Sequence, residues 1–570
     1  MIRSDDQVKP WGSGPEGRQA EARRAPTRSL FENLAAAGCG VAIVLLVACG
    51  PAPDPKLEAQ RFCERLEFVN EGNVDTRGLS EIGGHAKVAA TLLEVAPAAI
   101  QSELEQFHGV FEGWAAAVTG ERSMRDTFEA LSDTSLVGAE GRIADYIAEA
   151  CGIRIGDGSY VEVPRLRVQE VCPAWPRFIS PLSSNVFPNL PDIAGGNYFA
   201  NEFLITPLGV GVGNAFGVEP GGWVEIHGYY PETRYFAFHP NDMDLNNLPT
   251  LRDRDLDPDP GSVNPFREVP PPGSANTYTA KLVFGPPPEN PEPNTRYVGV
   301  KKDGESTNRY VLNLLRYYAT DPGDGANTGG FPLPAVTLYD AEGEVTQHFE
   351  ECDLYANGTE GLVSPLRFPM LPIADHRAAN PPFWGTSSNF EAPSDTLANA
   401  DVQYLSTVYS RRFGDIFVVR AKYLTAPDTR AGEPHHGAGK DVRLYTFCTY
   451  NVWNGSAIDC MLENELAVDG EGYYTVVVSD AANRPGNLAA EAATWIDWGP
   501  YLDGQLSWRY VYRENPKVVA IARAIDEGFS SEQRSPYAPV AAPCDRATFE
   551  AGGWRACFER AGISENKPGR

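Results

Sequence analysis

Hydrophobic side chains recur every three or four residues between residues 57 and 152, in a stretch rich in Ala, Glu and Leu. One run comprises Ile100, Leu104, Phe107, Phe111, Trp114 and Val118, and a second comprises Ile143, Ile147 and Cys151. This spacing places the side chains on one face of an α-helix, where they can pack against other helices. The pattern predicts a small helical bundle.

From about residue 160 the pattern changes to short runs of aromatic and β-branched residues, separated by Pro, Gly, Asn and Asp. The runs read GGWVEIHGYY, RYFAF, NTYTAKLVF, NRYVLNLLRYY, DIFVVRAKYL, DVRLYTFCTY, GYYTVVVS and QLSWRYVY. Closely spaced strands with no helical pattern between them are typical of antiparallel sandwiches and jelly rolls. We therefore expect a mainly β protein.

The β region also repeats itself. RYFAFHPND at residues 234–242 matches RLYTFCTYN at residues 443–451, and VLNLLRYYATDP, which ends at Pro322, matches LSWRYVYRENP, which ends at Pro516. The second match places Arg316 and Arg509 at equivalent positions, where we interpret them as strand arginines that pair with acidic loops. Duplication of one unit explains the length of the region. The fold expected is two related antiparallel β-sandwich domains, jelly-roll-like, preceded by a disulfide-stapled helical bundle.

An apolar run from Leu34 to Ala48 has the length of a signal-peptide core and is too short for a comfortable membrane span. It ends in the string LVAC at residues 46–49, which resembles the lipobox of bacterial lipoproteins. The resemblance implies cleavage before Cys49 and attachment of diacylglycerol to its sulfur. The alternative is an ordinary signal peptide. We expect an extracytoplasmic protein that is lipid-anchored to a bacterial membrane, at the cell surface or the periplasmic face.

These patterns divide the chain into seven parts. They are a leader and signal peptide (1–48), a lipidated tether (49–56), the helical bundle (57–155), the first β-sandwich (160–365), a proline-rich linker (366–394), the second β-sandwich (395–535) and a C-terminal tail (536–570).

Eight of the ten cysteines remain after Cys39 in the signal and Cys49 at the lipidation site are set aside. No pair has the CxxC spacing of a zinc site, and disulfides are the default outside the cytoplasm. Sequence alone does not fix the connectivity. Separation and domain boundaries favour the pairs Cys63–Cys151, Cys172–Cys352, Cys448–Cys460 and Cys544–Cys557.

The formal charge of −28 arises from 76 acidic and 48 basic residues. It would repel phosphates, so nucleic acid is excluded as a main partner. A cation is a candidate ligand, because Asp242, Asp244, Asn246 and Asp253 occupy the first, third, fifth and twelfth places of an EF-hand-like calcium loop. The alternative is a solvated acidic turn.

The chain contains no GxSxG elbow, no HExxH and no phosphate loop, so catalytic residues are not identified by motif. His227 and His239 flank the turn YYPET and could face each other beside Asp242, as a metal or acid–base centre. Two functions stay open. The first is a surface protein that binds a glycan or protein through aromatic residues in polar loops, namely Trp384, Trp495, Trp498 and Trp508. The alternative is an extracytoplasmic hydrolase centred on His227, His239 and Asp242.

The second half contains, in order, the segment NADVQY at residues 399–404 and the strings RLYTFCTYN, GYYTVVVSD, TWIDWGP and QLSWRYVY. This order of aromatic strand, acidic turn, Tyr-Thr strand, Trp loop and Arg-Tyr strand is similar to domain-of-unknown-function families 1214 and 1254. The resemblance implies a β-sandwich fold and no established chemistry.

Overall fold

The computed structural model describes part of the chain, and every described residue belongs to one unit, Asp54–Arg570. The other unit, Met1–Pro53, contains the predicted signal peptide and Cys49, and it lies outside the described residues. The described residues are 54–70, 73–75, 79, 81–118, 122, 135–153, 174–175, 177–178, 196–200, 221–242, 246–300, 308, 311–320, 328–353, 382, 384–387, 399, 401–452, 457–511, 514–526 and 535–563.

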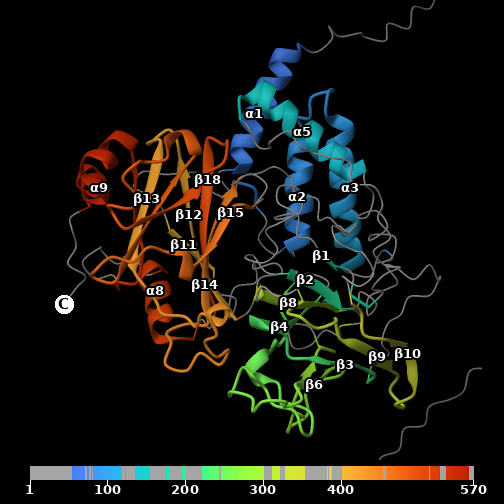
Figure 1. The fold of residues 1–570 in the computed structure, drawn as a ribbon. Coiled ribbons are helices and arrows are strands. Elements are labelled where there is room, and N and C mark those ends of the chain that lie inside the picture. Colours follow the sequence, from blue (N-terminus) through green and yellow to red (C-terminus); the bar gives the residue numbers. More distant parts are fainter. Residues whose placement is uncertain are drawn as a thin grey trace, which may run out of the picture. The chain divides into compact units, whose positions relative to one another are not determined.

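The N-terminal part of this unit is helical, as expected. Its helices are α1 (Pro55–Asn70), α2 (Glu81–Leu93), α3 (Gln101–Val118) and α5 (Ser135–Cys151). Helix α3 packs against both α2 and α5, and α1 packs against α5 (Figure 1). The periodic side chains form the core, since Leu104, Phe107, Trp114 and Ile143 are all at most 1% exposed. The spacing of apolar residues therefore identified the buried face of the bundle.

The described residues of the first β half form ten strands in two five-stranded sheets. One sheet has the order β1-β2-β8-β4-β5 and the other the order β10-β9-β3-β6-β7. The strands are β1 (Arg177–Phe178), β2 (Gly196–Ala200), β3 (Trp223–Tyr229), β4 (Thr233–Asn241), β5 (Leu251–Arg252), β6 (Thr277–Val283), β7 (Thr295–Tyr297), β8 (Leu312–Thr320), β9 (Ala335–Tyr339) and β10 (Val345–Phe349).

The second β half repeats this arrangement. Its sheets have the orders β11-β12-β18-β14-β15 and β17-β16-β13-β19. The strands are β11 (Trp384–Ser387), β12 (Val402–Ser410), β13 (Ile416–Lys422), β14 (Leu444–Asn451), β15 (Ala457–Leu462), β16 (Tyr473–Ser479), β17 (Ala493–Asp497), β18 (Asp503–Val511) and β19 (Val540–Cys544). The run β2-β8-β4-β5 corresponds to β12-β18-β14-β15, and β9-β3-β6-β7 to β19-β13-β16-β17, so the predicted duplication is confirmed.

Each half is a sandwich, because aromatic side chains of its two sheets meet between them. In the first half the Phe236 and Tyr278 rings lie 5.6 Å apart, and in the second the Phe447 and Tyr474 rings lie 5.3 Å apart. Most strand pairs are antiparallel, and only β6–β7 and β16–β17 are parallel among the described strands. The expected fold class is therefore confirmed.

The second half extends beyond its predicted bounds of residues 395–535. Strand β11 comes from the predicted linker and pairs with β12, while β19 comes from the predicted tail and pairs with β13. Helix α8 (Pro516–Asp526) packs against β11, and α9 (Arg546–Arg560) packs against β13 and β19 (Figure 1). The proline content of the linker and the position of the tail near the C-terminus concealed these two edge strands.

Three disulfides join predicted pairs: Cys63–Cys151, Cys448–Cys460 and Cys544–Cys557. Cys352 is also disulfide-bonded, whereas Cys172, its predicted partner, lies outside the described residues. Such disulfides are typical of an oxidising compartment outside the cytoplasm.

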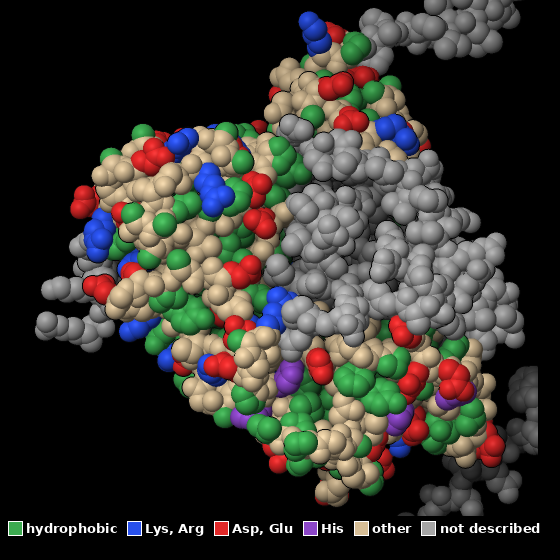
Figure 2. All heavy atoms as spheres, in the orientation of Figure 1, with side chains coloured by type: hydrophobic (Ala, Val, Ile, Leu, Met, Phe, Trp, Pro, Cys, Tyr) green, Lys and Arg blue, Asp and Glu red, His purple; other side chains and the backbone are tan. Residues whose placement is uncertain are grey.

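Among the described residues, we find no helix with the length and apolar character needed to cross a membrane. Figure 2 shows acidic and basic side chains interspersed over the visible face of the described part, without a single basic patch.

Candidate ligand site at the junction of the two β halves

Strand β4 is buried along its whole length, which sets it apart from the alternating pattern of β3. On one face Phe236 and Phe238 enter the core of the first half. On the other face Tyr235 and Ala237 join a separate apolar cluster. That cluster also contains Tyr318 and Ala319 of β8 and, from the second half, Val402, Leu444, Leu462 and Val511. We call this contact between the two β halves the junction.

Two buried arginines exchange ion pairs across the junction. Arg234 of β4 pairs with Glu463 of the second half, and Arg443, next to β14, pairs with Asp253 of the first half at 3.9 Å. All four residues are at most 2% exposed. Arg234 and Arg443 are equivalent in the sequence repeat, so the duplicated halves offer the same residues to each other.

The two carboxylates are also equivalent in their local contacts. Asp253 lies in the 3-10 turn η2 (Asp253–Asp255) and accepts a hydrogen bond from the backbone amide of Phe236 at 3.3 Å. Glu463 lies in η4 (Glu463–Glu465) and accepts one from the backbone amide of Tyr445 at 3.2 Å. Each carboxylate thus fixes its own strand and neutralises the arginine of the other half.

A third buried carboxylate of the junction is Asp401, which lies 3.3 Å from Arg252 of β5. Burial raises the pKa of Asp401 to about 7, although Arg252 and Arg254 act to lower it. Burial likewise raises the pKa of Glu463 against the effect of Arg234. Desolvation therefore outweighs ion pairing at both carboxylates.

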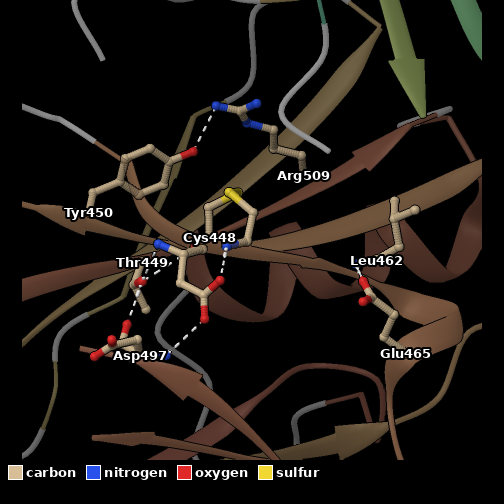
Figure 3. Close-up of a disulfide and its surroundings, with 9 residues drawn as sticks. Cys448, Thr449, Tyr450, Leu462, Glu465, Asp497 and Arg509 are labelled. Atoms are coloured by element: carbon tan, nitrogen blue, oxygen red, sulfur yellow. Dashed lines mark hydrogen bonds between the residues drawn. A yellow bond between two sulfur atoms is a disulfide. The ribbon is translucent and has the colours of Figure 1, made fainter. Parts of the chain in front are cut away.

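Arg316 of β8 and Arg509 of β18 occupy equivalent positions in the central strands of the two halves. The Nη1 of Arg316 contacts the Tyr318 hydroxyl at 3.3 Å, and the Nη2 of Arg509 donates to the Tyr450 hydroxyl at 2.8 Å. The guanidinium carbon of Arg509 also lies 5.9 Å from the centre of the Tyr404 ring. Figure 3 shows Arg509 and Tyr450 beside the disulfide of Cys448.

Further polar contacts link these side chains across the junction. The Tyr235 hydroxyl lies 3.3 Å from the side-chain oxygen of Asn399 and 3.2 Å from a ring nitrogen of His239. The backbone amide of Asn399 donates to the Tyr404 hydroxyl at 3.0 Å. We name the whole group the Arg–Tyr cluster: Arg316, Arg509, Tyr235, Tyr318, Tyr404, Tyr450, His239 and Asn399.

The pKa values of the Arg–Tyr cluster are set by burial and by its two arginines. Burial acts to raise the pKa of Tyr318, but Arg316 and Arg509 outweigh it, and the net pKa of this phenol is lowered. Burial and then Arg316 hold the pKa of His239 well below its usual range, so this imidazole is neutral. At Tyr235, Tyr404 and Tyr450, by contrast, burial raises the pKa above the usual range of a phenol.

The predicted calcium ligands are distributed over a hairpin. Asp242 and Asn246 close its turn, where the Asn246 backbone amide donates to the Asp242 carboxylate at 2.9 Å. Asp253 instead contacts Phe236, which precedes Asp242 by roughly 20 Å of extended strand. Asp244 lies outside the described residues. Asp242 and Asp253 are thus held apart, unlike the ligands of an EF-hand loop, and the described residues contain no cluster of His, Cys, Asp or Glu suited to a metal.

The histidine centre is not assembled by the fold. His227 lies on β3, and His239 lies on β4 in the opposite sheet, because the turn between them crosses the sandwich and does not form a hairpin within one sheet. His227 is half-exposed and lies 3.4 Å from Asp259, whereas His239 is fully buried beside Tyr235. The expectation that these two imidazoles face each other is wrong.

The tryptophans proposed as a binding surface are mostly core residues. Trp384, Trp498 and Trp508 are 8%, 1% and 0% exposed, and Trp384 packs on Trp508. Trp495 is partly buried and donates its indole N–H to Ser479. An aromatic docking surface made of these four residues is therefore excluded.

Sequence reasoning found the equivalence of Arg316 and Arg509 but missed the tyrosines around them. It also missed the exchanged ion pairs, for which a signal exists: Asp253 follows Arg234 by 19 residues, and Glu463 follows Arg443 by 20. Acidic residues at matching places in a repeat could have identified both pairs. Their exchange between halves depends on how the duplicated units pack, which no single stretch encodes.

No family model matches the chain, and no curated protein matches it. Among solved structures, an uncharacterized protein from Burkholderia cenocepacia is similar, with 14% identity and a TM-score of 0.36, over 74% of this chain and 95% of that one. The VPA0106 protein from Vibrio parahaemolyticus shows 11% identity and a TM-score of 0.27, over 67% of this chain and 95% of that one. At these TM-scores the similarities carry no argument about function.

Proposed function

We propose that the protein is a lipid-anchored, extracytoplasmic binding protein whose ligand site is the Arg–Tyr cluster. The observation that carries this proposal is the placement of Arg316 and Arg509 on equivalent strands of the two halves, where their guanidinium groups contact the hydroxyls of Tyr318 and Tyr450. The alternative of a hydrolase centred on His227, His239 and Asp242 has lost its geometric basis, since the two imidazoles lie in different sheets.

Contacts outside the Arg–Tyr cluster also hold the halves together. Ion pairs of Arg234, Arg443, Arg252 and Arg254 already cross the junction, and an apolar cluster lies between the halves. We place the ligand at this contact because the Arg–Tyr cluster offers hydrogen-bonding side chains of both halves. Sites of this kind occur preferentially where two domains meet.

A bound compound that copurifies with the protein tests the site. The full chain is expressed with its own leader, purified in detergent and denatured, and the released small molecules are identified by mass spectrometry. We expect a stoichiometric compound from the wild type that is absent from the Arg316→Gln/Arg509→Gln variant. The matched control is Arg420→Gln, which removes a buried arginine of β13 that contacts Thr475 and Asp469. Strand β13 belongs to the sheet of the second half that does not contain Arg509.

The control should retain the compound. If the wild type releases nothing and no member of a small-molecule library raises its melting temperature, the binding function is wrong.

Membrane anchorage is tested separately at Cys49, which follows the apolar core of the predicted signal. The Cys49→Ser variant should move from the membrane to the soluble fraction and lose labelling by radioactive palmitate. A Cys39→Ser variant serves as control, because Cys39 lies within the predicted signal. Membrane association of the Cys49→Ser variant, together with an unlabelled wild type, would contradict the lipoprotein proposal.

A further inference from the structure

We propose that the Cys448–Cys460 disulfide is a reversible redox switch, and that its reduction by a dithiol loosens the contact between Tyr450 and Arg509 while the second half stays folded. This inference goes beyond the proposed binding function and does not depend on a ligand. It is carried by the position of the two cysteines in their sheet, by their counterparts in the first half and by the contacts around them.

The disulfide joins directly opposite residues of two neighbouring strands. Cys448 of β14 and Cys460 of β15 are register partners in a strand pair that also has its own backbone ladder. Phe447 and Met461 belong to the core of the second half, whereas both cysteines form a separate small cluster with Tyr450. Because side chains alternate between the two faces of a strand, the disulfide lies on the face turned away from that core.

The first half shows that this strand pair does not need a covalent bond. In the sequence repeat Cys448 corresponds to His239, and Cys460 corresponds to Thr250, each three residues before the carboxylate of an exchanged ion pair. The Oγ1 of Thr250 and the Nδ1 of His239 lie 3.2 Å apart. Strands β4 and β5 thus pair with a noncovalent contact where β14 and β15 have the disulfide. We therefore assign the disulfide a role other than holding the strands together.

Other contacts hold the two strands when the disulfide is open. The Thr449 hydroxyl donates to the backbone carbonyl of Asp497 at 2.7 Å (Figure 3). The Asp459 carboxylate accepts a hydrogen bond from the backbone amide of Asp497 at 3.0 Å. Thr449 and Asp459 are the chain neighbours of the two cysteines, and Asp497 belongs to β17 in the opposite sheet. Reduction should therefore leave β14 and β15 attached to the rest of the sandwich.

Tyr450 connects the disulfide with the Arg–Tyr cluster. It packs in the small cluster of the two cysteines, and its hydroxyl accepts a hydrogen bond of 2.8 Å from Arg509 (Figure 3). Two sulfur atoms that are no longer bonded separate to van der Waals distance. Because buried side chains are close-packed, this separation displaces the Tyr450 ring and weakens its hydrogen bond to Arg509.

Access to the disulfide depends on β15. This strand is the last of its sheet and, among the described strands, pairs with β14 alone, so local opening of the edge exposes Cys460. Cys460 is 6% exposed and Cys448 is 1% exposed, which makes Cys460 the sulfur that a reductant reaches first.

The exchange needs a dithiol as reductant. One thiolate of the dithiol attacks the Sγ of Cys460, a mixed disulfide forms, and Cys448 leaves as a thiolate. The second thiolate of the dithiol then displaces Cys460 and closes a disulfide within the reagent. Two electrons pass from the dithiol to the protein, and the two protons of the dithiol are taken up by Cys448 and Cys460.

The first test is native reduction of the full chain in detergent. The protein is treated with increasing dithiothreitol, free thiols are blocked with N-ethylmaleimide, and the labelled cysteines are identified by mass spectrometry. The matched control is Cys544–Cys557, which closes 13 residues against 12 but joins two fully buried cysteines. We expect Cys448 and Cys460 to be labelled at a roughly tenfold lower dithiothreitol concentration, while the protein is still folded. Oxidised glutathione should restore the bond.

The second test asks whether reduction reaches Tyr450. The tyrosine band in near-ultraviolet circular dichroism should change on reduction of the wild type, and most of this change should be absent in Tyr450→Phe. The Cys448→His/Cys460→Thr variant carries the pair of the first half, so its spectrum should not respond to dithiothreitol. A Cys544→Ser/Cys557→Ser variant should respond as the wild type does.

Labelling of Cys448 and Cys460 in the folded protein, together with the spectral change at Tyr450, supports the switch. Labelling only together with Cys544 and Cys557, or only after unfolding, would make the bond a structural one. Labelling with no change at Tyr450 would separate the disulfide from the Arg–Tyr cluster. Either result overturns the proposal, and both are measured on the wild type, so the decision does not depend on whether the cysteine variants fold.

Discussion

At the scale of single residues, the junction places carboxylates where solvation is poor. Asp401 is 3% exposed and Glu463 is 1% exposed, and burial raises the pKa of both in spite of nearby arginines. A buried ion pair is weak evidence for stability, since the cost of desolvation can exceed the attraction between the charges. These residues make the junction sensitive to pH.

Asp401 gives a pH dependence with a definite sign. Its pKa is about 7 in the folded protein and about 3.9 in the unfolded chain. The folded state therefore binds more protons, and stability from this group is present at pH 4 and lost as the pH rises to about 7. In Asp401→Asn this loss is absent, so the variant should gain stability relative to the wild type by about 1 kcal/mol per pH unit over that range.

Denaturant unfolding at several pH values from 4.5 to 8 measures the difference in the free energy of unfolding between the wild type and Asp401→Asn. Effects of other titrating groups, such as Glu463, are common to both proteins and cancel. A constant difference across this range would show that Asp401 does not titrate there.

Substitution of Glu463 tests how much the exchanged ion pairs contribute to stability. Glu463→Gln leaves Arg234 with Asp428 alone, at 3.5 Å, and we expect the free energy of unfolding to fall by roughly 3 to 5 kcal/mol. Asp257→Asn is the matched control, since Asp257 pairs with Arg267 at 2.6 Å where both side chains are largely exposed. Exposed pairs contribute at most about 1 kcal/mol. Similar losses in both variants, measured by guanidinium denaturation, would contradict the importance of the buried exchange.

At the scale of elements, the sequence predicted which segments form strands better than it predicted which strands lie next to each other. Short aromatic and β-branched runs between turn residues identified β3, β4, β6, β8, β13, β14, β16 and β18, because the preference of such residues for strands is a property of the segment itself. Strands β11 and β19 were missed, since they lie at sheet edges and β19 contains Pro543. His239 was expected to face His227 across a hairpin. The turn YYPET instead leads from β3 in one sheet to β4 in the other, because the same turn residues suit both kinds of connection.

The disulfides of the helices differ in the length of chain that they close. Cys63–Cys151 closes 88 residues and joins α1 to α5, whereas Cys544–Cys557 closes 13 residues between β19 and α9. Chain entropy predicts that removing the first costs about 4.6 kcal/mol and the second about 3 kcal/mol.

The two cysteine-to-serine double variants can be compared by denaturation, with fluorescence of the buried Trp114 reporting the bundle. The first variant should unfold the bundle at the lower denaturant concentration. The reverse order would show that strain or residual structure outweighs the entropy of the long loop.

At the scale of the whole molecule, the sequence predicted the architecture and an oxidising compartment, and it did not identify the Arg–Tyr cluster. The duplication could be recognised because Arg234 and Arg443 begin matching segments of the sequence. Such a match does not show which faces of the two copies pack together. The Arg–Tyr cluster depends on that meeting, since Arg316 and Arg509 are separated by 193 residues. The calcium loop was suggested by spacing alone, with a solvated turn as its alternative, whereas in the structure Asp253 pairs with Arg443.

The junction should also make the two β halves unfold together. Its apolar cluster and exchanged ion pairs are present only while both halves are folded, so loss of either half exposes the apolar face of the other and removes the partner of Arg234 or Arg443. We expect a single calorimetric transition for the two halves of the wild type. Asp253→Asn combined with Glu463→Gln weakens both exchanged pairs at once and should separate this transition into two.

Tryptophan fluorescence assigns the two transitions, because the buried Trp498 and Trp508 report the second half and Trp175 reports the first. The control is Asp257→Asn, which should keep one transition, since its pair with Arg267 lies within the first half. Unfolding of the doubly substituted protein in one transition, at a lower temperature, would mean that the apolar cluster alone couples the halves. Two transitions already in the wild type would mean that the junction does not couple them, and the Arg–Tyr cluster would then be lost as soon as the weaker half unfolds.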